Sequence, residues 1–198
     1  MTKRRRGVSL PVTLALSLSL ILLLAGCGDK EEEEEADVTI VSMATDVGGL
    51  GDKSFNDGAH AGLEQAETEF DSVEARVVQS KQQTDYVPNL TGLAEDGAEI
   101  VFAVGFLMAD AMIEAANANP DTYFAGIDIG VDPESAPDNV RGIQFREQES
   151  GYLAGVVAGM LTKEHASASE KLNEDNVVGM VLGMDIPPVE RFQAGFYA

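Results

Sequence analysis

The chain has 198 residues, of which 13 are Lys or Arg and 34 are Asp or Glu, so its formal net charge is −21 at pH 7. This balance argues against nucleic acid as a partner, because phosphates bind to basic surfaces, and against a strongly anionic small ligand. The acid excess is typical of proteins from high-salt environments, although an ordinary acidic surface explains it equally well.

The N-terminal segment has the pattern of a lipoprotein signal. Basic residues at positions 3–6 precede the apolar run Val8–Ala25, which ends in Leu24-Ala25-Gly26-Cys27. We predict a signal peptide over residues 1–26, with the thiol of Cys27, the only cysteine, as the lipid acceptor. An uncleaved spanning helix is the alternative, since about 18 apolar residues just cross a bilayer. The protein is therefore expected on the extracytoplasmic side of the cell membrane, held there by its lipid.

The segment that follows Cys27 is expected to be a spacer. Residues 28–36 include five consecutive glutamates. Like charges in such a run repel one another and keep the chain extended. Residues 27–36 are therefore predicted to be an acidic tether.

From Val38 onward, short apolar runs alternate with helical patterns. Apolar side chains recur at helical spacing from Phe55, and Ser54 is the expected N-cap of that helix. Such alternation predicts an α/β fold, a Rossmann-like parallel sheet with helices on both faces. The predicted strands are 38–43, 73–78, 99–104, 123–127, 140–145 and 177–182, and the predicted helices are 55–66, 86–95, 107–118, 148–162 and one from Pro188.

Ligands of parallel sheets bind beyond the carboxyl ends of the strands. The loops that begin at Thr45, Gly105, Asp128 and Gly183 are expected to share that edge. The binding residues should therefore be found among them.

Enzymatic motifs fail in this chain. The Gly-rich loop 48–54 has Asp52 where a phosphate-binding loop needs glycine, and Ser54 where a dinucleotide fingerprint needs its third glycine. There is no Gly-x-Ser-x-Gly elbow and no His-Glu-x-x-His pair. The two histidines, His60 and His165, lie far apart in sequence and are expected to be solvated. We predict a binding protein without catalytic residues, metal or cofactor.

A glycine repeat marks the helix predicted over 148–162. Gly151, Gly155 and Gly159 recur at a spacing of four residues. The apolar stretch around them is too short to span a membrane, so we expect close packing of this helix against the sheet.

Three segments together resemble the basic membrane protein (BMP) family of purine nucleoside receptor A-like lipoproteins. They are Thr45–Asn56; Gly105-Phe106 with Phe124–Asp128; and Val140–Leu161 continuing to Gly183-Met184-Asp185 and Phe192. The resemblance covers essentially all of Val38–Ala198. It implies the periplasmic-binding-protein type I architecture and a substrate-binding protein of an ABC importer, a monomer that hands its ligand to a permease.

The resemblance also implies the binding residues. Phe55 would stack on a purine, Asn56 would pair with the base edge, and Asp46 and Asp128 would accept hydrogen bonds from ribose hydroxyls or a base N–H. Phe106, Gly183 and Met184 are further candidates. Each has a plainer alternative: Phe55 as a core residue, and the polar residues as helix or turn caps.

The implied domain division is an N-terminal ligand-binding lobe over 37–145, then a crossover helix and the start of a second lobe over 146–198. Members of the family continue well past the point that matches Ala198, so the second lobe is expected to be truncated and the chain ending there to bind ligand poorly. A receptor for a sugar or another small solute, or a surface adhesion or signalling lipoprotein on the same fold, are the alternative functions.

Overall fold

The computed structural model describes residues 38–164, 169–172, 175 and 177–198. The predictions for the signal peptide 1–26, for Cys27, for the tether 27–36 and for His165 fall outside the described residues. Within the described ranges, none of the helices combines the length and the hydropathy that crossing a bilayer requires.

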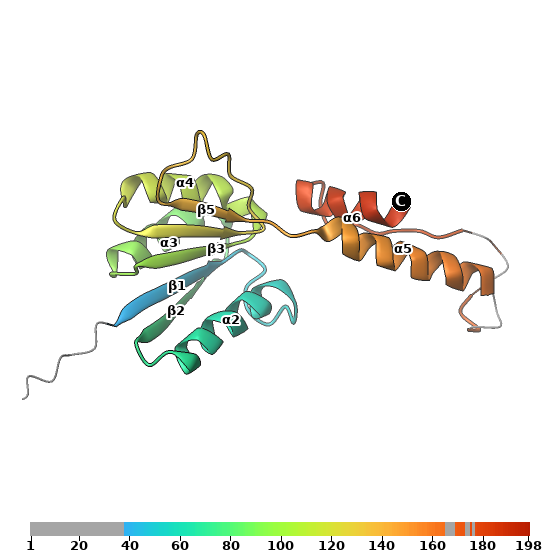
Figure 1. The fold of residues 1–198 in the computed structure, drawn as a ribbon, viewed down its shortest axis with the longest axis horizontal. Helices are drawn as coiled ribbons and strands as arrows, with labels where there is room; N and C mark the ends of the chain where they lie inside the picture. The colour runs from blue at the N-terminus through green and yellow to red at the C-terminus, as the bar shows by residue number, and fades with distance from the viewer. Residues whose placement is uncertain (1–37, 165–168, 173–174, 176) are drawn as a thin grey trace, which may run out of the picture. The chain divides into compact units, whose positions relative to one another are not determined.

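A five-stranded parallel sheet organises the structure (Figure 1). All four strand pairs are parallel, and the spatial order is β2-β1-β3-β4-β5. The prediction of a parallel α/β sheet is confirmed, with strand ends displaced by one or two residues. The strands are β1 (Thr39–Thr45), β2 (Val73–Gln79), β3 (Ile100–Val104), β4 (Tyr123–Ile127) and β5 (Val140–Ile143).

The helices lie close to their predicted positions, except that the helix predicted over 107–118 is split. A 3₁₀ turn occupies Phe106–Met108, and the α-helix proper begins only at Ala109. A second 3₁₀ turn spans Gln83–Asp85. The helices are α2 (Phe55–Glu69), α3 (Tyr86–Glu95), α4 (Ala109–Ala118), α5 (Glu147–Glu164) and α6 (Pro187–Tyr197).

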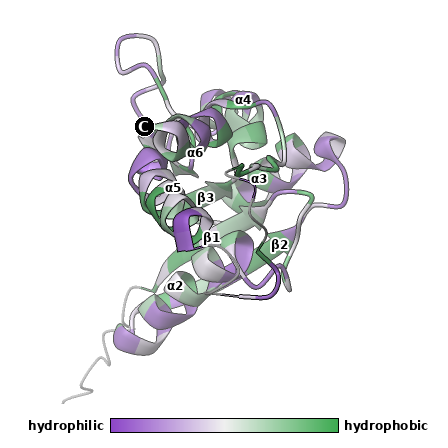
Figure 2. Cartoon of the chain, turned by 90° about the vertical axis from the view of Figure 1, so that its right-hand side faces the viewer, coloured by the Kyte–Doolittle hydropathy of each residue, from purple (hydrophilic) through white to green (hydrophobic). Residues whose placement is uncertain are grey.

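Both faces of the sheet are covered, as the buried strand sequences require. Side chains of successive strand residues point to opposite faces. Ala44 therefore packs with Leu90 of α3 and Met112 of α4, whereas its neighbour Met43 packs with Leu63 of α2. Figure 2 shows β1 and β3 mostly hydrophobic, while hydrophilic and hydrophobic residues alternate along α2.

The strand order places a crevice between β1 and β3. The chain leaves β1 toward α2 on one face, and it leaves β3 toward α4 on the other face (Figure 1). Where successive connections diverge in this way, the carboxyl edge of a parallel sheet opens and ligands bind there. This edge carries the loops that begin after Thr45, Val104 and Ile127.

The prediction of a sixth strand over 177–182 is wrong. These residues form no strand, Val177 is 79% exposed and Val181 is fully exposed. A β-branched run becomes a strand only when a neighbour pairs with its backbone. None of the strands in the described part of the chain pairs with it.

Two glycines of the repeat, Gly151 and Gly155, pack against a helix and not against the sheet, so that expectation is also wrong. A Cβ on Gly151 would overlap the carbonyl group of Phe192, and one on Gly155 would overlap that of Phe196. Gly195 of α6 lies equally close to the carbonyl group of Gln148. Small residues on both helices therefore allow the backbones of α5 and α6 to touch, as Figure 1 shows for the two neighbouring helices.

Candidate functional site

Asp46 stands at the crevice, directly after β1. Its Oδ1 accepts hydrogen bonds from the backbone N–H of Gly48 at 2.8 Å and from Nδ2 of Asn56 at 2.9 Å. Gly105, at the end of β3, has a φ of +124°, and a Cβ there would lie 3.0 Å from Oδ2 of Asp46. Glycine is required at this position because it allows both the positive φ and the close approach of the carboxylate.

The N-terminus of α2 is capped by Asp52, so the expectation that Ser54 caps it is wrong. The side chain of Ser54 makes no capping bond. The carboxylate of Asp52 accepts hydrogen bonds from the backbone N–H groups of Asn56 at 2.8 Å, Ser54 at 3.0 Å and Asp57 at 3.1 Å. These bonds, that from Asn56 first, lower the pKa of Asp52 to about 2. A carboxylate here complements the helix dipole and satisfies donors that one hydroxyl could not.

Asn56 is held below the binding surface. It is 2% exposed, and its Nδ2 donates to Asp46 at 2.9 Å and to Asp52 at 3.3 Å. Its Oδ1 is buried and has no hydrogen-bond partner in the structure. Asn56 is not among the residues that line the two cavities described next, and its amide nitrogen supports Asp46, so its pairing with a base edge remains a prediction.

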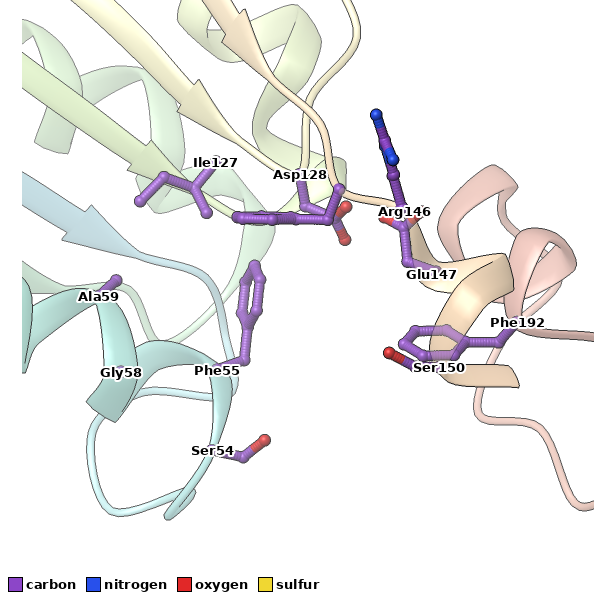
Figure 3. A pocket seen from close by; sticks show the side chains of 11 residues that line it. Ser54, Phe55, Gly58, Ala59, Ile127, Asp128, Arg146, Glu147, Ser150 and Phe192 are labelled. Carbon is purple, nitrogen blue, oxygen red and sulfur yellow. The ribbon is translucent and has the colours of Figure 1, made fainter. Parts of the chain in front are cut away.

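A cavity of about 500 Å³ opens at the carboxyl edge of the sheet (Figure 3). Phe55 of α2 and Phe192 of α6 lie on opposite sides of it, and Asp128 lies at the end of β4 between them. Its volume is in the range that binds small organic ligands. The remaining lining residues are Ser54, Gly58, Ala59, Ile127, Phe145, Arg146, Glu147 and Ser150.

A smaller cavity of about 170 Å³ shares Phe55 and Asp128 with the first. Asp46 and Phe106 line it from the ends of β1 and β3. Met184 lines it from the segment that precedes α6. The two cavities are therefore neighbours, with Phe55 and Asp128 in the wall of both.

Asp128 has an unusual backbone and an unusual carboxyl group. Its φ is +65°, a conformation that aspartate tolerates better than most residues. Its side chain is 17% exposed, and Oδ1 is buried without a hydrogen-bond partner. Burial and, after it, the neighbouring carboxyl group of Glu147 raise the pKa of Asp128 to about 6.

Glu147 and Arg191 form a bidentate ion pair beside Asp128. Nε and Nη2 of Arg191 donate to the two carboxylate oxygens of Glu147 at 2.6 and 3.0 Å. These bonds lower the pKa of Glu147 to about 2 and raise that of Arg191. Nη2 of Arg191 is 3.9 Å from Oδ1 of Asp128, which is too far for a hydrogen bond. The guanidinium of Arg191 therefore hydrogen-bonds to Glu147 and not to Asp128.

The structure brings most of the candidate residues together. Asp46, Phe55, Phe106, Asp128 and Met184 all line a cavity. Gly183 does not; it is exposed, and nothing lies within 4 Å of the position of a Cβ there.

The sequence reasoning missed several lining residues. Phe145 and Glu147 follow β5, so the rule about strand carboxyl ends could have found them. Nothing local marks Phe192 and Arg191 as neighbours of Asp128, because they reach the site on a separate helix.

Comparisons with known proteins agree with this fold. Residues 39–198 match the Bmp family, described as ABC transporter substrate-binding protein PnrA-like. An uncharacterized lipoprotein of Pyrococcus furiosus is 37% identical over 79% of this chain and 37% of its own length. The ABC transporter nucleoside-binding protein BmpA of Lactococcus lactis is 31% identical over 79% of this chain and 42% of its own length.

A solved structure gives the same result. An ABC transporter solute-binding protein of Aeropyrum pernix is 32% identical and superimposes with a TM-score of 0.69 over 80% of this chain and 41% of that protein. The present chain thus spans about two fifths of the length of the proteins it resembles. Its α/β fold is that of the ABC solute-binding proteins, and the chain belongs to the Bmp family of PnrA-like ABC transporter substrate-binding proteins.

Proposed function

We propose that the protein is a lipid-anchored receptor of an ABC importer and that it binds an uncharged purine nucleoside in the cavity between Phe55 and Phe192. The observation that carries this proposal is the pair of aromatic rings on opposite sides of a 500 Å³ cavity (Figure 3). A flat base presents a face to such a ring, and stacking on an aromatic side chain stabilises a bound base by about 1–3 kcal/mol. The name of the Lactococcus lactis relative supports the same ligand class.

The polar groups of the site favour a ligand that donates hydrogen bonds. Asp46 and Asp128 are acceptors that line the smaller cavity, whereas ribose hydroxyls and base N–H groups are donors. Phe106 and Met184 would close the smaller cavity around the ligand, with Gly183 next to Met184 in the chain. A phosphate would meet carboxylates here, because Arg191 is already bound to Glu147 and Arg146 is paired with Glu149 at 3.0 Å.

Calorimetric titration tests the ligand class. The titration uses the protein as its gene encodes it, and the chain described here spans about two fifths of its relatives' length. Adenosine, guanosine and inosine should bind more tightly than their monophosphates, because each phosphate is repelled by the carboxylates. Free sugars serve as the control. Tighter binding of a sugar or of a monophosphate than of any nucleoside would contradict the proposal.

The proposed anchor is a lipid on Cys27, and the proposed location is the extracytoplasmic side of the membrane. The lipoprotein name of the Pyrococcus furiosus relative supports it. The wild-type protein isolated from its membrane should carry an acyl mass at Cys27, and Cys27→Ala should carry none, because no other thiol is present. A wild-type protein that begins at Cys27 without added mass would contradict the anchor.

The proposed receptor acts as a monomer that delivers its ligand to a permease, and it binds without chemical turnover. Residues 37–145 would form the first lobe of the receptor. The crossover would begin with α5, so residues 146–198 would include the start of the second lobe. The ion pair between Glu147 and Arg191 supports this division, because it connects the first turn of α5 to α6.

A further inference from the structure

We propose that Glu147 and Arg191 are positioning residues for Asp128: they favour a proton on its carboxyl group in the cavity wall, and ligand binding displaces that proton. The ligand half of this inference rests on the proposed function. The geometrical half depends only on three side chains that come from different elements.

The geometry begins with Arg191. Its guanidinium donates from Nε to Oε2 of Glu147 at 2.6 Å and from Nη2 to Oε1 at 3.0 Å. Glu147 is only 5% exposed. A bidentate pair of this kind keeps the carboxylate ionised and fixes its orientation. Glu147 is therefore a negative charge of fixed position at the first residue of α5.

Asp128 faces that fixed charge from the end of β4. Both carboxyl groups line the same cavity, and one nitrogen of Arg191, Nη2, lies 3.0 Å from Oε1 of Glu147 and 3.9 Å from Oδ1 of Asp128. Two carboxyl groups that lie close together at a poorly solvated site do not both ionise easily. Since Arg191 stabilises the ionised form of Glu147, the proton belongs to Asp128, and the burial of Asp128 that raises its pKa agrees with this.

The other charged groups near the two cavities have partners other than Asp128. Among the residues that line the two cavities, the remaining titratable ones are Asp46 and Arg146. Asp46 accepts hydrogen bonds from Gly48 and Asn56, and Arg146 is 78% exposed and paired with Glu149. After burial, which is the largest influence on the pKa of Asp128, the charged groups that act on it are therefore Glu147 and Arg191.

A nucleoside changes the balance because its hydroxyl groups donate hydrogen bonds. A ribose O–H that donates to Asp128 binds the ionised carboxylate better than the neutral acid, so the Asp128 proton leaves to solvent as the ligand enters. Affinity should then rise with pH through about 6, the pKa of Asp128. Between about pH 5 and about pH 7.5 the ionised fraction, and with it the affinity, should increase about tenfold.

The test is an NMR titration of the Asp128 carboxyl carbon in the ligand-free protein, for the wild type and two variants. Glu147→Gln removes the negative neighbour, so the pKa of Asp128 should fall. Arg191→Gln removes the cation that stabilises both carboxylates, so that pKa should rise. Glu149→Gln is the matched control, because Glu149 lies on the same helix but is exposed and pairs with Arg146; it should leave the titration unchanged.

The two variants must shift the titration in opposite directions, which a merely structural role would not produce. An ordinary pKa for Asp128, or shifts of the same sign in both variants, would overturn the inference. Adenosine titrations in buffers of different ionisation enthalpy then measure the proton released near the pKa of Asp128; binding without proton release would overturn the ligand half. If Asp128 responds as expected but no nucleoside binds, the proposed function fails while the positioning roles are supported.

Discussion

Replacing Phe55 with alanine should weaken nucleoside binding by roughly tenfold to a hundredfold, and replacing Phe192 should have an effect of the same size. Each variant removes one of the two aromatic faces of the cavity, and each lost stacking contact is worth about 1–3 kcal/mol. Calorimetric titration with adenosine measures the loss. Circular dichroism melts show whether each variant remains folded.

Phe70→Ala is the matched control for this pair. Phe70 lies at the other end of α2 from Phe55, is 57% exposed and lines neither cavity. Its replacement should leave the affinity unchanged. Equal affinities of wild type, Phe55→Ala and Phe192→Ala would move the ligand away from this cavity.

Replacing Gly195 with alanine should separate α6 from α5 and abolish most ligand binding. The added Cβ would overlap the backbone carbonyl group of Gln148, and backbone cannot move aside as a flexible side chain can. Overpacking of this kind destabilises a protein by typically about 1–3 kcal/mol. Because α6 carries Phe192 and Arg191, its displacement should remove both from the site, so the loss of affinity should exceed that of Phe192→Ala.

The control for Gly195→Ala is Gly159→Ala, since nothing lies within 4 Å of a Cβ at Gly159 on α5. Alanine is a better helix former than glycine by about 0.5–1 kcal/mol, so this variant should be neutral or slightly more stable. Thermal melts should therefore show a lower melting temperature for Gly195→Ala and an equal or higher one for Gly159→Ala. Adenosine titrations should show a loss of affinity for Gly195→Ala only. A Gly195→Ala protein with wild-type affinity would show that contact between the helices does not position the site.

Local sequence patterns alone determine the sheet and its functional edge. The alternation of short apolar runs with helical periodicity leaves a parallel α/β sheet as the only arrangement that buries both patterns. Because the carboxyl ends of parallel strands share one edge, the positions of Asp46 and Asp128 at strand ends suffice to place them together. Such patterns depend on a few neighbouring residues, and this is why they can be read from the sequence.

Local sequence patterns do not predict a structural element correctly when its stability depends on a particular hydrogen-bond partner. Ser54 is a good N-cap residue, but the carboxylate of Asp52 binds three backbone N–H groups and replaces it. The apolar run 177–182 has strand propensity, but no neighbouring strand pairs with it in the described structure, and it stays exposed. Propensity alone does not decide either case. The cap is decided by which side chain reaches the free backbone N–H groups, and a strand is decided by whether another strand pairs with its backbone.

Tertiary packing decides which side chains complete the site. Arg191 binds Glu147 across 44 residues of sequence, and it does so because glycines on α5 and α6 allow their backbones to touch. That contact brings Phe192 opposite Phe55, and it places two carboxyl groups and one guanidinium at the same point. No periodicity or motif encodes such a meeting of residues, since it follows from how separate helices pack against the edge of the sheet.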